Sequence, residues 1–403
     1  MSLIPINYLI NDTRSIKDFK DKTFSGYKKK DVLTIFQKNI LADDIEQSCH
    51  WGCELLISGY VSEIWNIIFS IYLKFVNIFN PKVIEILFIR YTTYLKISRN
   101  KNNLELRNIQ IIRNHITEII CILCKSKKGK QIKLSKIDSS KFKMDFLSSM
   151  FKADRDYIKH ISYKNDPPEL SIIMNELYYN LIKKNFDNKI FWFTWCIEWE
   201  KINSKKKNKI LISTRDIKGI PKNNCNDMIW IFWELILDYL KRINIEYYSK
   251  KINYLFLLFK LNYKILPKTK NIWFIIMSLM LLTKSFNLET PLINDYKYII
   301  QSTGNINFLF LDFKKCEKTD DPLHNHKIKI LNAKIIDNNQ KKETKEESKK
   351  DSKKDKKNIK DNISTNKFNK LLELDEKFIS NNSYNGIKKE ELKNKVINDF
   401  KKN

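Results

Sequence analysis

The sequence predicts an all-α fold, a multi-helix array of antiparallel helical hairpins with a disordered, Lys-rich C-terminal tail. Apolar residues recur at steps of three and four over most of the chain, which keeps one face of each α-helix apolar. The 403 residues include only seven glycines and eight prolines, too few for the many tight turns of a β-sandwich or barrel. The end of the chain is highly charged and poor in apolar residues, so burial cannot offset the entropy of ordering it.

The chain divides into five expected parts. A polar, Lys-rich stretch interrupts the helical pattern and ends in Asp-Pro-Pro at 166–168, which stops any helix. With 43% apolar residues, the chain can form a core on each side of this stretch. The parts are an N-terminal arm (1–23), an N-terminal helical domain (24–125), a basic connection (126–168), a C-terminal aromatic-rich helical domain (169–331) and a disordered charged tail with short amphipathic segments (332–403).

The N-terminal helical domain is predicted to contain five helices. Polar residues at their boundaries indicate how they begin and end: Asp31 is a candidate cap for the first helix, and Gly59 is a candidate C-cap for the second. Asn80, which precedes a proline, is expected to accept hydrogen bonds from the free amides of the fourth. The five helices are expected at about 31–40, 45–59, 61–75, 80–95 and 104–123.

Residues 25–94 also carry a series of short motifs. They are Ser-Gly-Tyr-Lys-Lys, Lys-x-Ile-Leu, Glu-x-x-x-x-Trp, Glu-Leu-Ile-x-Ser-Gly and Asn-Pro, in that order. The series resembles an uncharacterised protein family conserved in nucleocytoplasmic large DNA viruses. The same segment is similar to the helical C-terminal oligomerisation domain, or collar, of clamp-loader-type AAA+ ATPases. These resemblances imply a viral protein with collar-like hairpins and no established activity, carried by Ser25, Gly26, Tyr27, Lys38, Glu46, Trp51, Glu54, Gly59, Asn80 and Pro81.

The C-terminal helical domain is unusually aromatic. Trp192, Trp195 and Trp199 share one face of a predicted helix, where they would either stack single-stranded bases or form core. A short loop around Pro267 joins two further helices, which favours an antiparallel hairpin. The last part of this domain is expected to hold one more helix and then an extended piece at 307–313.

The formal net charge of +28 predicts an anionic partner such as DNA or RNA. Residues 332–403 hold 20 Lys and 13 Asp plus Glu, a net +7, so +21 belongs to the rest of the chain. Lys greatly outnumbers Arg, which favours phosphate contacts over base recognition. The alternative is that A/T-rich codons have loaded the surface with Lys without selection for binding. Two Lys-rich loops supply the candidate contacts, which are Lys127, Lys128, Lys130, Lys133, Lys205, Lys206, Lys207 and Lys209.

Two pairs of closely spaced cysteines are candidate metal ligands. Cys121 and Cys124 have Cys-x-x-Cys spacing, and Cys49 and Cys53 are four residues apart on the second predicted helix. If the two helices touch, the four thiols would form one zinc site; otherwise they are small buried side chains. A second candidate consists of His324 and His326 with Asp320 and Asp321, for which a polar loop is the alternative. The primary expectation is no metal.

The sequence lacks the motifs of common enzymes. It contains no phosphate-binding G-x-x-x-x-G-K-[ST], no dinucleotide fingerprint, no G-x-S-x-G and no H-E-x-x-H. We therefore expect a non-enzymatic protein without a cofactor. Its most apolar run, 272–282, is shorter than the roughly 20 residues of a membrane span, so none is expected.

Seven irregularly spaced cysteines suit a reducing compartment, and the first residues lack the basic and apolar regions of a secretory signal. We expect the host cytoplasm or a viral factory, or packaging in the virion, and not secretion. The expected function is association with DNA replication or repair, through binding of nucleic acid or viral replication proteins by a basic surface; a homo-oligomer is also possible. The alternatives are a virion-core or other scaffolding protein and an enzyme with no recognisable motif.

Overall fold

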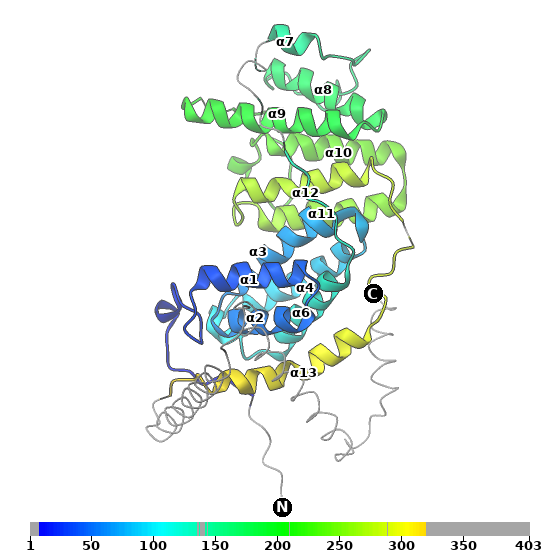
Figure 1. Cartoon of the computed structure of the whole chain (residues 1–403). Helices are drawn as coiled ribbons and strands as arrows, with labels where there is room; N and C mark the ends of the chain where they lie inside the picture. The colour runs from blue at the N-terminus through cyan, green and yellow to red at the C-terminus, as the bar shows by residue number, and fades with distance from the viewer. Residues whose placement is uncertain are drawn as a thin grey trace, which may run out of the picture. The chain divides into compact units, whose positions relative to one another are not determined.

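The computed structural model describes residues 8–134, 137, 142, 144–208, 210–287 and 289–319, and over these residues the fold is all-α (Figure 1). No strand forms within these ranges, where β pairing is confined to single bridges, Lys22 with Lys28 and Leu211 with Asp227. The predicted all-α class is therefore confirmed. The tail predicted at 332–403 and the candidate ligands Asp320, Asp321, His324 and His326 lie outside the described residues.

Contacts within the chain define two compact units. The larger unit is Arg14–Gly304, and the other comprises Met1–Thr13 and Asn305–Asn403. The larger unit runs through the stretch 126–168, where the sequence suggested a boundary between two domains. The five-part division stays a prediction.

The first part of the larger unit contains the helices predicted between residues 24 and 125, except that the fifth, expected as one helix at 104–123, is broken at 107–109 into two helices. Consecutive helices α1 and α2 pack on each other, and α2 also packs on α6. Gly52 allows the approach of α2 to its neighbours, because a Cβ there would lie 2.8 Å from Ile120 Cδ1 and 3.3 Å from the Phe36 ring. The elements are η1 (Ile16–Phe19), α1 (Lys29–Leu41), α2 (Ile45–Ile57), α3 (Val61–Ile71), η2 (Tyr72–Val76, a π-helical turn), η3 (Asn77–Phe79), α4 (Val83–Ser98), α5 (Asn103–Leu106) and α6 (Gln110–Lys125).

Two predicted helix caps are wrong. Helix α1 begins at Lys29 with Lys28 at the N-cap, so Asp31 lies inside the first turn. Asn80 does not cap α4 through its side chain; its Nδ2 donates to Ser126 Oγ at 3.2 Å and to the Leu292 carbonyl at 2.9 Å. For Asn80, contacts distant in sequence outweigh the local preference of the residue type. Gly59 does follow the end of α2, with a φ of +82°.

The second part of the larger unit is built around buried aromatic side chains. Trp192 and Trp195 on α9 are buried, as are Trp230 and Trp233 on α10. The core interpretation of the predicted aromatic row is therefore confirmed for Trp192 and Trp195. Helix α8 packs on α9 and α11 packs on α12, as expected for hairpins. The elements are α7 (Met144–Ser148), α8 (Pro168–Ile182), α9 (Phe186–Lys205), η5 (Lys222–Asn224), α10 (Ile229–Ile243), α11 (Glu246–Asn262) and α12 (Lys268–Leu281).

Helices from the two parts of this unit share a buried contact. The hydroxyl of Tyr91 on α4 lies 3.0 Å from Asn262 Oδ1 on α11. The rings of Phe69 on α3 and Phe274 on α12 are 5.7 Å apart between centroids. Because these side chains are buried, the N-terminal and C-terminal helices of the unit belong to one continuous core.

Helix α13 (Lys297–Lys314) corrects the prediction for 307–313, which is helical and not extended. The short apolar run at 308–311 is compatible with a strand, but Ile306, Phe310 and Phe313 also continue a helical stripe and are buried. In the smaller unit the ring of Tyr8 meets the edge of Phe308 at 6.2 Å, and the amide of Thr13 donates to the Lys318 carbonyl at 2.9 Å.

One helical segment among the described residues, Val61–Phe79, is long and apolar enough to cross a membrane, with a mean hydropathy of 1.2. However, 61% of the 18-residue apolar window in this segment is buried inside the protein, as in a core helix. The run at 272–282 lies in and just after α12, where its side chains are also buried. The structure is therefore consistent with the expectation of no membrane span.

Candidate nucleic-acid interface

The first Lys-rich loop follows α6 and is held against the body. The amide of Gly129 donates to the Phe75 carbonyl at 2.8 Å, and a Cβ at Gly129 would overlap the Phe79 ring. Lys128 is used internally: its ammonium pairs with Asp43 and donates to the Cys124 carbonyl at 2.9 Å. By contrast, Lys127, Lys130 and Lys133 are exposed.

The second Lys-rich loop is more accessible. Lys205 is the last residue of α9, Lys206 is its C-cap, and Lys207 follows in the left-handed region at φ +61°. All three side chains are exposed, and none pairs with a carboxylate in the part of the chain that the structure describes. Cations are also favourable at a helix C-terminus, so part of this pattern stabilises α9 itself. Lys209 lies outside the described residues.

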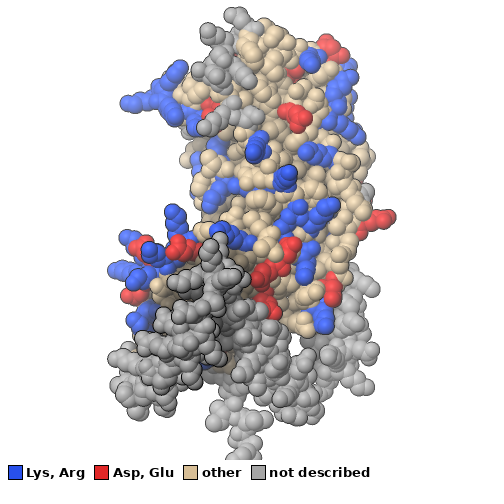
Figure 2. All heavy atoms as spheres, in the orientation of Figure 1, with Lys and Arg blue, Asp and Glu red and all other residues tan. Residues whose placement is uncertain are grey.

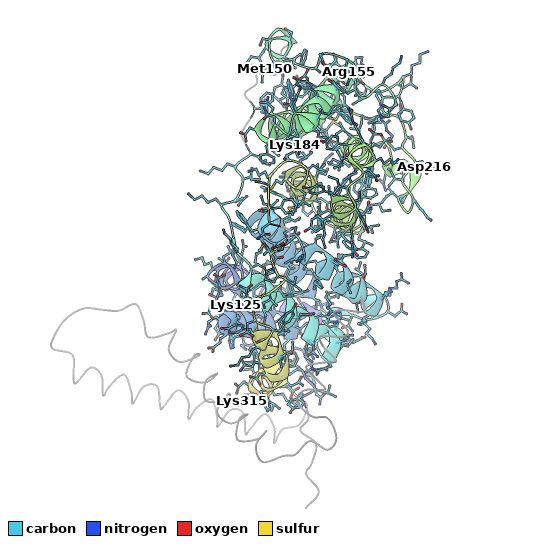
Figure 3. All side chains as sticks on the ribbon, turned by 90° about the vertical axis from the view of Figure 1, so that its right-hand side faces the viewer. Lys125, Met150, Arg155, Lys184, Asp216 and Lys315 are labelled. Atoms are coloured by element: carbon cyan, nitrogen blue, oxygen red, sulfur yellow. The ribbon has the colours of Figure 1, made fainter. Side chains whose placement is uncertain are left out.

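The structure does not bring the two loops together. Figures 1 and 3 place α6, which ends at Lys125, among the N-terminal helices, and α9 beyond α10 and α12. Figure 2 shows Lys and Arg side chains spread over the face in view, where they outnumber Asp and Glu. On this face the basic residues are therefore distributed and do not form a single patch.

Several residues of the motif series at 25–94 secure the turn before α1 against α2. The fully buried carboxylate of Glu54 accepts hydrogen bonds from the amide of Ser25 at 2.8 Å and from its hydroxyl at 2.7 Å. The Ser58 hydroxyl accepts one from the Phe24 amide at 2.8 Å. Gly26 has a φ of +89°, which favours glycine. Tyr27 is half exposed and lies edge-on to Trp51, with 5.4 Å between ring centroids.

The remaining motif residues lie in turns or on helices. Pro81 is buried in the turn before α4, and a Cβ at Gly59 would lie 2.9 Å from Leu104 Cδ2. Lys38 is exposed on α1. Glu46 is half-buried, and burial, with the nearby charge of Asp44, raises the pKa of its carboxyl. The motif series therefore corresponds largely to turns and helix contacts.

Helices α2 and α6 do touch, and they bring the predicted cysteines into one region. Cys49 and Cys121 interact directly, while Cys124 Sγ lies 3.5 Å from Ser48 Oγ. All four thiols are buried and free. The contact with Cys121 and burial raise the pKa of Cys49, and burial raises that of Cys124 to about 12, whereas the contact with Cys49 lowers the pKa of Cys121. Among the described residues, no group of three or more His, Cys, Asp or Glu side chains could hold a metal ion, so Cys49, Cys53, Cys121 and Cys124 do not assemble the considered site.

Buried charges that sequence inspection missed stabilise the loops around α10. Arg215 pairs with Asp166 at 2.7 Å and with Glu234 at 2.6 Å, and the side chains of Arg215 and Asp166 are fully buried. Burial opposes ionisation of Asp166, but the Arg215 hydrogen bond keeps the pKa of the carboxyl below its usual value. The sequence shows only ordinary charged residues at these positions, since their partners are distant along the chain.

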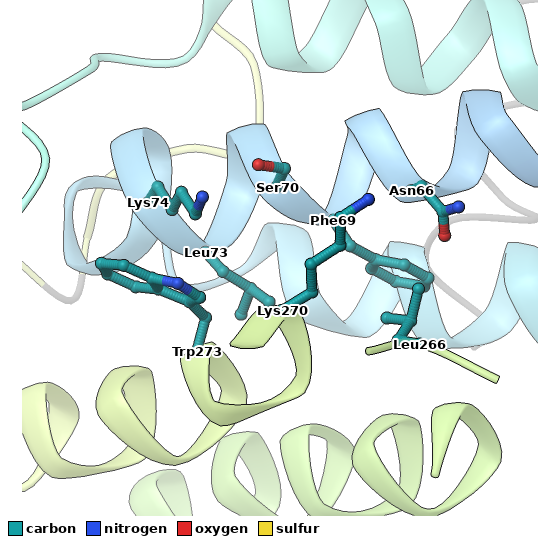
Figure 4. A pocket seen from close by; sticks show the side chains of 8 residues that line it. All are labelled: Asn66, Phe69, Ser70, Leu73, Lys74, Leu266, Lys270 and Trp273. Carbon is teal, nitrogen blue, oxygen red and sulfur yellow. The ribbon is translucent and has the colours of Figure 1, made fainter. Parts of the chain in front are cut away.

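A shallow hollow lies between α3, η2 and the start of α12 (Figure 4). Lys74 on η2 and Lys270 on α12 stand at its rim, and Lys74 Nζ lies 5.2 Å from the centroid of the Trp273 ring. The hollow encloses about 270 Å³, including space open to solvent. Its residues come from distant parts of the sequence, which gave no signal for it. They are Asn66, Phe69, Ser70, Leu73, Lys74, Leu266, Lys270 and Trp273.

Comparisons with protein-family models, with curated proteins and with solved structures found no match. The viral and collar resemblances therefore stay predictions from the motif residues.

Proposed function

We propose that this chain is a non-enzymatic, helical viral protein that binds nucleic acid through surface lysines and associates with the DNA replication or repair apparatus. The observation that carries the proposal is the group Lys205, Lys206 and Lys207, exposed at the end of α9 without a carboxylate partner among the described residues. Phosphates attract such ammonium groups regardless of base sequence. The net charge of +28 strengthens this attraction at long range.

Other lysines of the body are neutralised locally. Lys29 pairs with Glu63 at 2.6 Å, and Lys251 pairs with Glu85 at 2.8 Å. A lysine whose charge already faces a carboxylate contributes less to phosphate binding. The lysines after α9 have no such carboxylate among the described residues, which supports this loop as a phosphate contact. If codon bias alone explains these lysines, replacing them should not change nucleic-acid binding.

The first prediction concerns this loop. Replacing Lys205, Lys206 and Lys207 by Ser should weaken binding to duplex DNA and reduce the slope of log K against log[salt] by up to about 2.7, because each phosphate contact contributes about 0.9. Binding should change little between DNA sequences, since Lys lacks the guanidinium fork that reads guanine. Titrations by fluorescence anisotropy at several salt concentrations measure both quantities.

The matched control carries Ser at Lys17, Lys20 and Lys22, which are also exposed. A normal slope in the control and a reduced slope in the loop variant supports the contact. Equal reductions in the two variants indicate diffuse attraction without a preferred surface. An unchanged slope in the loop variant removes this loop from the proposed function, and a wild-type chain that fails to bind at low salt contradicts the proposal itself.

The association with replication proteins requires a separate experiment. A pull-down from infected cells, performed with and without nuclease, separates proteins held through DNA from direct partners. Replication proteins that persist after nuclease treatment support a direct partner, and their loss leaves nucleic acid as the link. Recovery of neither DNA nor replication proteins contradicts this part of the proposal.

A further inference from the structure

We infer that the hollow between α3, η2 and α12 binds a phosphate group, which either a polynucleotide backbone or a free phosphate compound can supply. The inference goes beyond the proposed function, because it concerns a defined site that was not predicted from the sequence. Four hydrogen-bond donors stand around this hollow: the side chains of Asn66, Ser70, Lys74 and Lys270. A phosphate has several oxygens that accept from ammonium, amide and hydroxyl groups together.

None of these four polar side chains forms a hydrogen bond or an ion pair with another described residue. Lys74 contacts the ring of Trp273, and it is close enough to Lys270 for the charge of Lys270 to affect its pKa. Burial, together with the charge of Lys270, lowers the pKa of Lys74. The folded chain therefore holds two like charges in the lining of one hollow that contains no carboxylate. A bound anion would offset that repulsion.

The position of Lys270 strengthens this argument. It lies in the first turn of α12, where the helix dipole is positive and where a cation is unfavourable. The neighbouring Lys268 is neutralised there by Glu200 at 2.5 Å and Asp227 at 2.9 Å. Lys270 has no such partner in the described part of the chain. The first turn also contains no acidic residue that could offset the charge of Lys270.

The backbone and the size of the hollow fit a small group. Lys74 lies within the π-helical turn η2, a distortion that often occurs at functional sites. The floor is apolar, formed by buried Phe69, Leu73, Leu266 and Trp273. The hollow is partly open to solvent and has enclosed room for little more than a water molecule, so a phosphate group would lie at its mouth with some of its oxygens in solvent.

The test replaces both lysines in the full chain, as Lys74→Gln with Lys270→Gln. The control is Lys96→Gln with Lys101→Gln, which removes the same charge from two exposed lysines outside the hollow. Without ligand, the hollow variant should melt at or above the wild-type temperature, because a repulsion has been removed. The single variant Lys270→Gln, at an exposed position, provides a second measurement if the double variant does not fold.

Two measurements distinguish the source of the phosphate. In the first, inorganic phosphate is compared with chloride at equal ionic strength in thermal denaturation. In the second, the salt slope of duplex DNA binding is measured, and the hollow variant should lose about 0.9 if one backbone phosphate binds there. A phosphate-specific stabilisation that the hollow variant lacks and the control keeps indicates a free phosphate compound. A reduced DNA slope without that stabilisation indicates a polynucleotide.

The inference is overturned if the wild type and the hollow variant show the same phosphate stabilisation and the same DNA salt slope, whatever the result for the variant of the loop after α9. If the wild type fails to bind DNA but shows the phosphate-specific stabilisation, the proposed function fails and the inference stands. The two proposals are therefore tested independently.

Discussion

At the scale of single residues, a charged side chain in the core has a consequence for stability. Lys189 on α9 is fully buried, and its Nζ has no hydrogen-bond partner within the described part of the chain. Burial lowers the pKa of the amine to about 7. At neutral pH the fold therefore holds a desolvated amine that is partly charged, which costs stability.

The second prediction is that Lys189→Met stabilises the protein at pH 7 by about 1–3 kcal/mol, because it removes a buried polar group without a partner. Between pH 7 and about 10, the unfolded wild type binds a proton at Lys189 that the folded protein has released, so this residue makes stability rise with pH. The variant should lack that rise. Urea denaturation at pH 7 and pH 9 measures both effects.

The control for this experiment is Lys201→Met on the same helix, where the side chain is 58% exposed. It should change stability by no more than about 0.5 kcal/mol, with no effect on the pH dependence. A destabilised Lys189→Met variant would show instead that the ammonium has a partner in solution.

At the scale of elements, the approach of α2 to α1 and α6 depends on the lack of a side chain at Gly52. The methyl group of an alanine would lie 2.8 Å from the end of Ile120 and 3.3 Å from the ring of Phe36. Gly304, within α13, has open space around the same position. The two glycines therefore separate the packing effect of a methyl group from its effect on helix propensity.

The third prediction is that Gly52→Ala destabilises the protein by about 1–3 kcal/mol through overpacking, which exceeds the gain in helix propensity. Gly304→Ala should stabilise it by up to about 1 kcal/mol, because alanine loses less backbone entropy in a helix. Thermal and urea denaturation of the two variants measure the difference. Stabilisation by both substitutions would mean that Ile120 and Phe36 move aside at little cost.

At the scale of the whole molecule, the buried contact between α3 and α12 joins regions that the sequence suggested as separate domains. Phe69 and Phe274 meet there, and Tyr91 binds Asn262 nearby. Such a shared core favours cooperative unfolding of the larger unit, since neither part keeps its buried surface without the other.

The fourth prediction is that the two parts of the larger unit unfold at the same urea concentration. Buried cysteines report on both: Cys49 and Cys121 in the first part, Cys196 and Cys225 in the second. Alkylation of each cysteine at increasing urea concentration, followed by mass spectrometry, gives separate midpoints for the two parts. Coincident midpoints are expected, whereas an earlier transition in one pair would support the division predicted at 126–168.

The sequence by itself determined the class of the fold and most of its helices. Apolar residues spaced three and four apart are buried together on one face of an α-helix, so four of the five helices predicted between residues 24 and 125 appear close to their expected positions. The fifth, expected at 104–123, is divided into α5 and α6. The same information located exposed lysines but could not show that Lys128 pairs internally while Lys205 does not. Local sequence patterns indicate secondary-structure propensity, but they do not show which residues a side chain contacts in the fold.

Only the tertiary structure decided which residues meet. It buried Trp192 and Trp195, turned Asn80 away from its helix, and made 307–313 helical. It also brought Lys74 and Lys270 to the same hollow, an arrangement that no spacing in the sequence predicts. The physical reason is that hydrogen bonds, burial and charge interactions act over a few ångströms in space, whatever the separation along the chain.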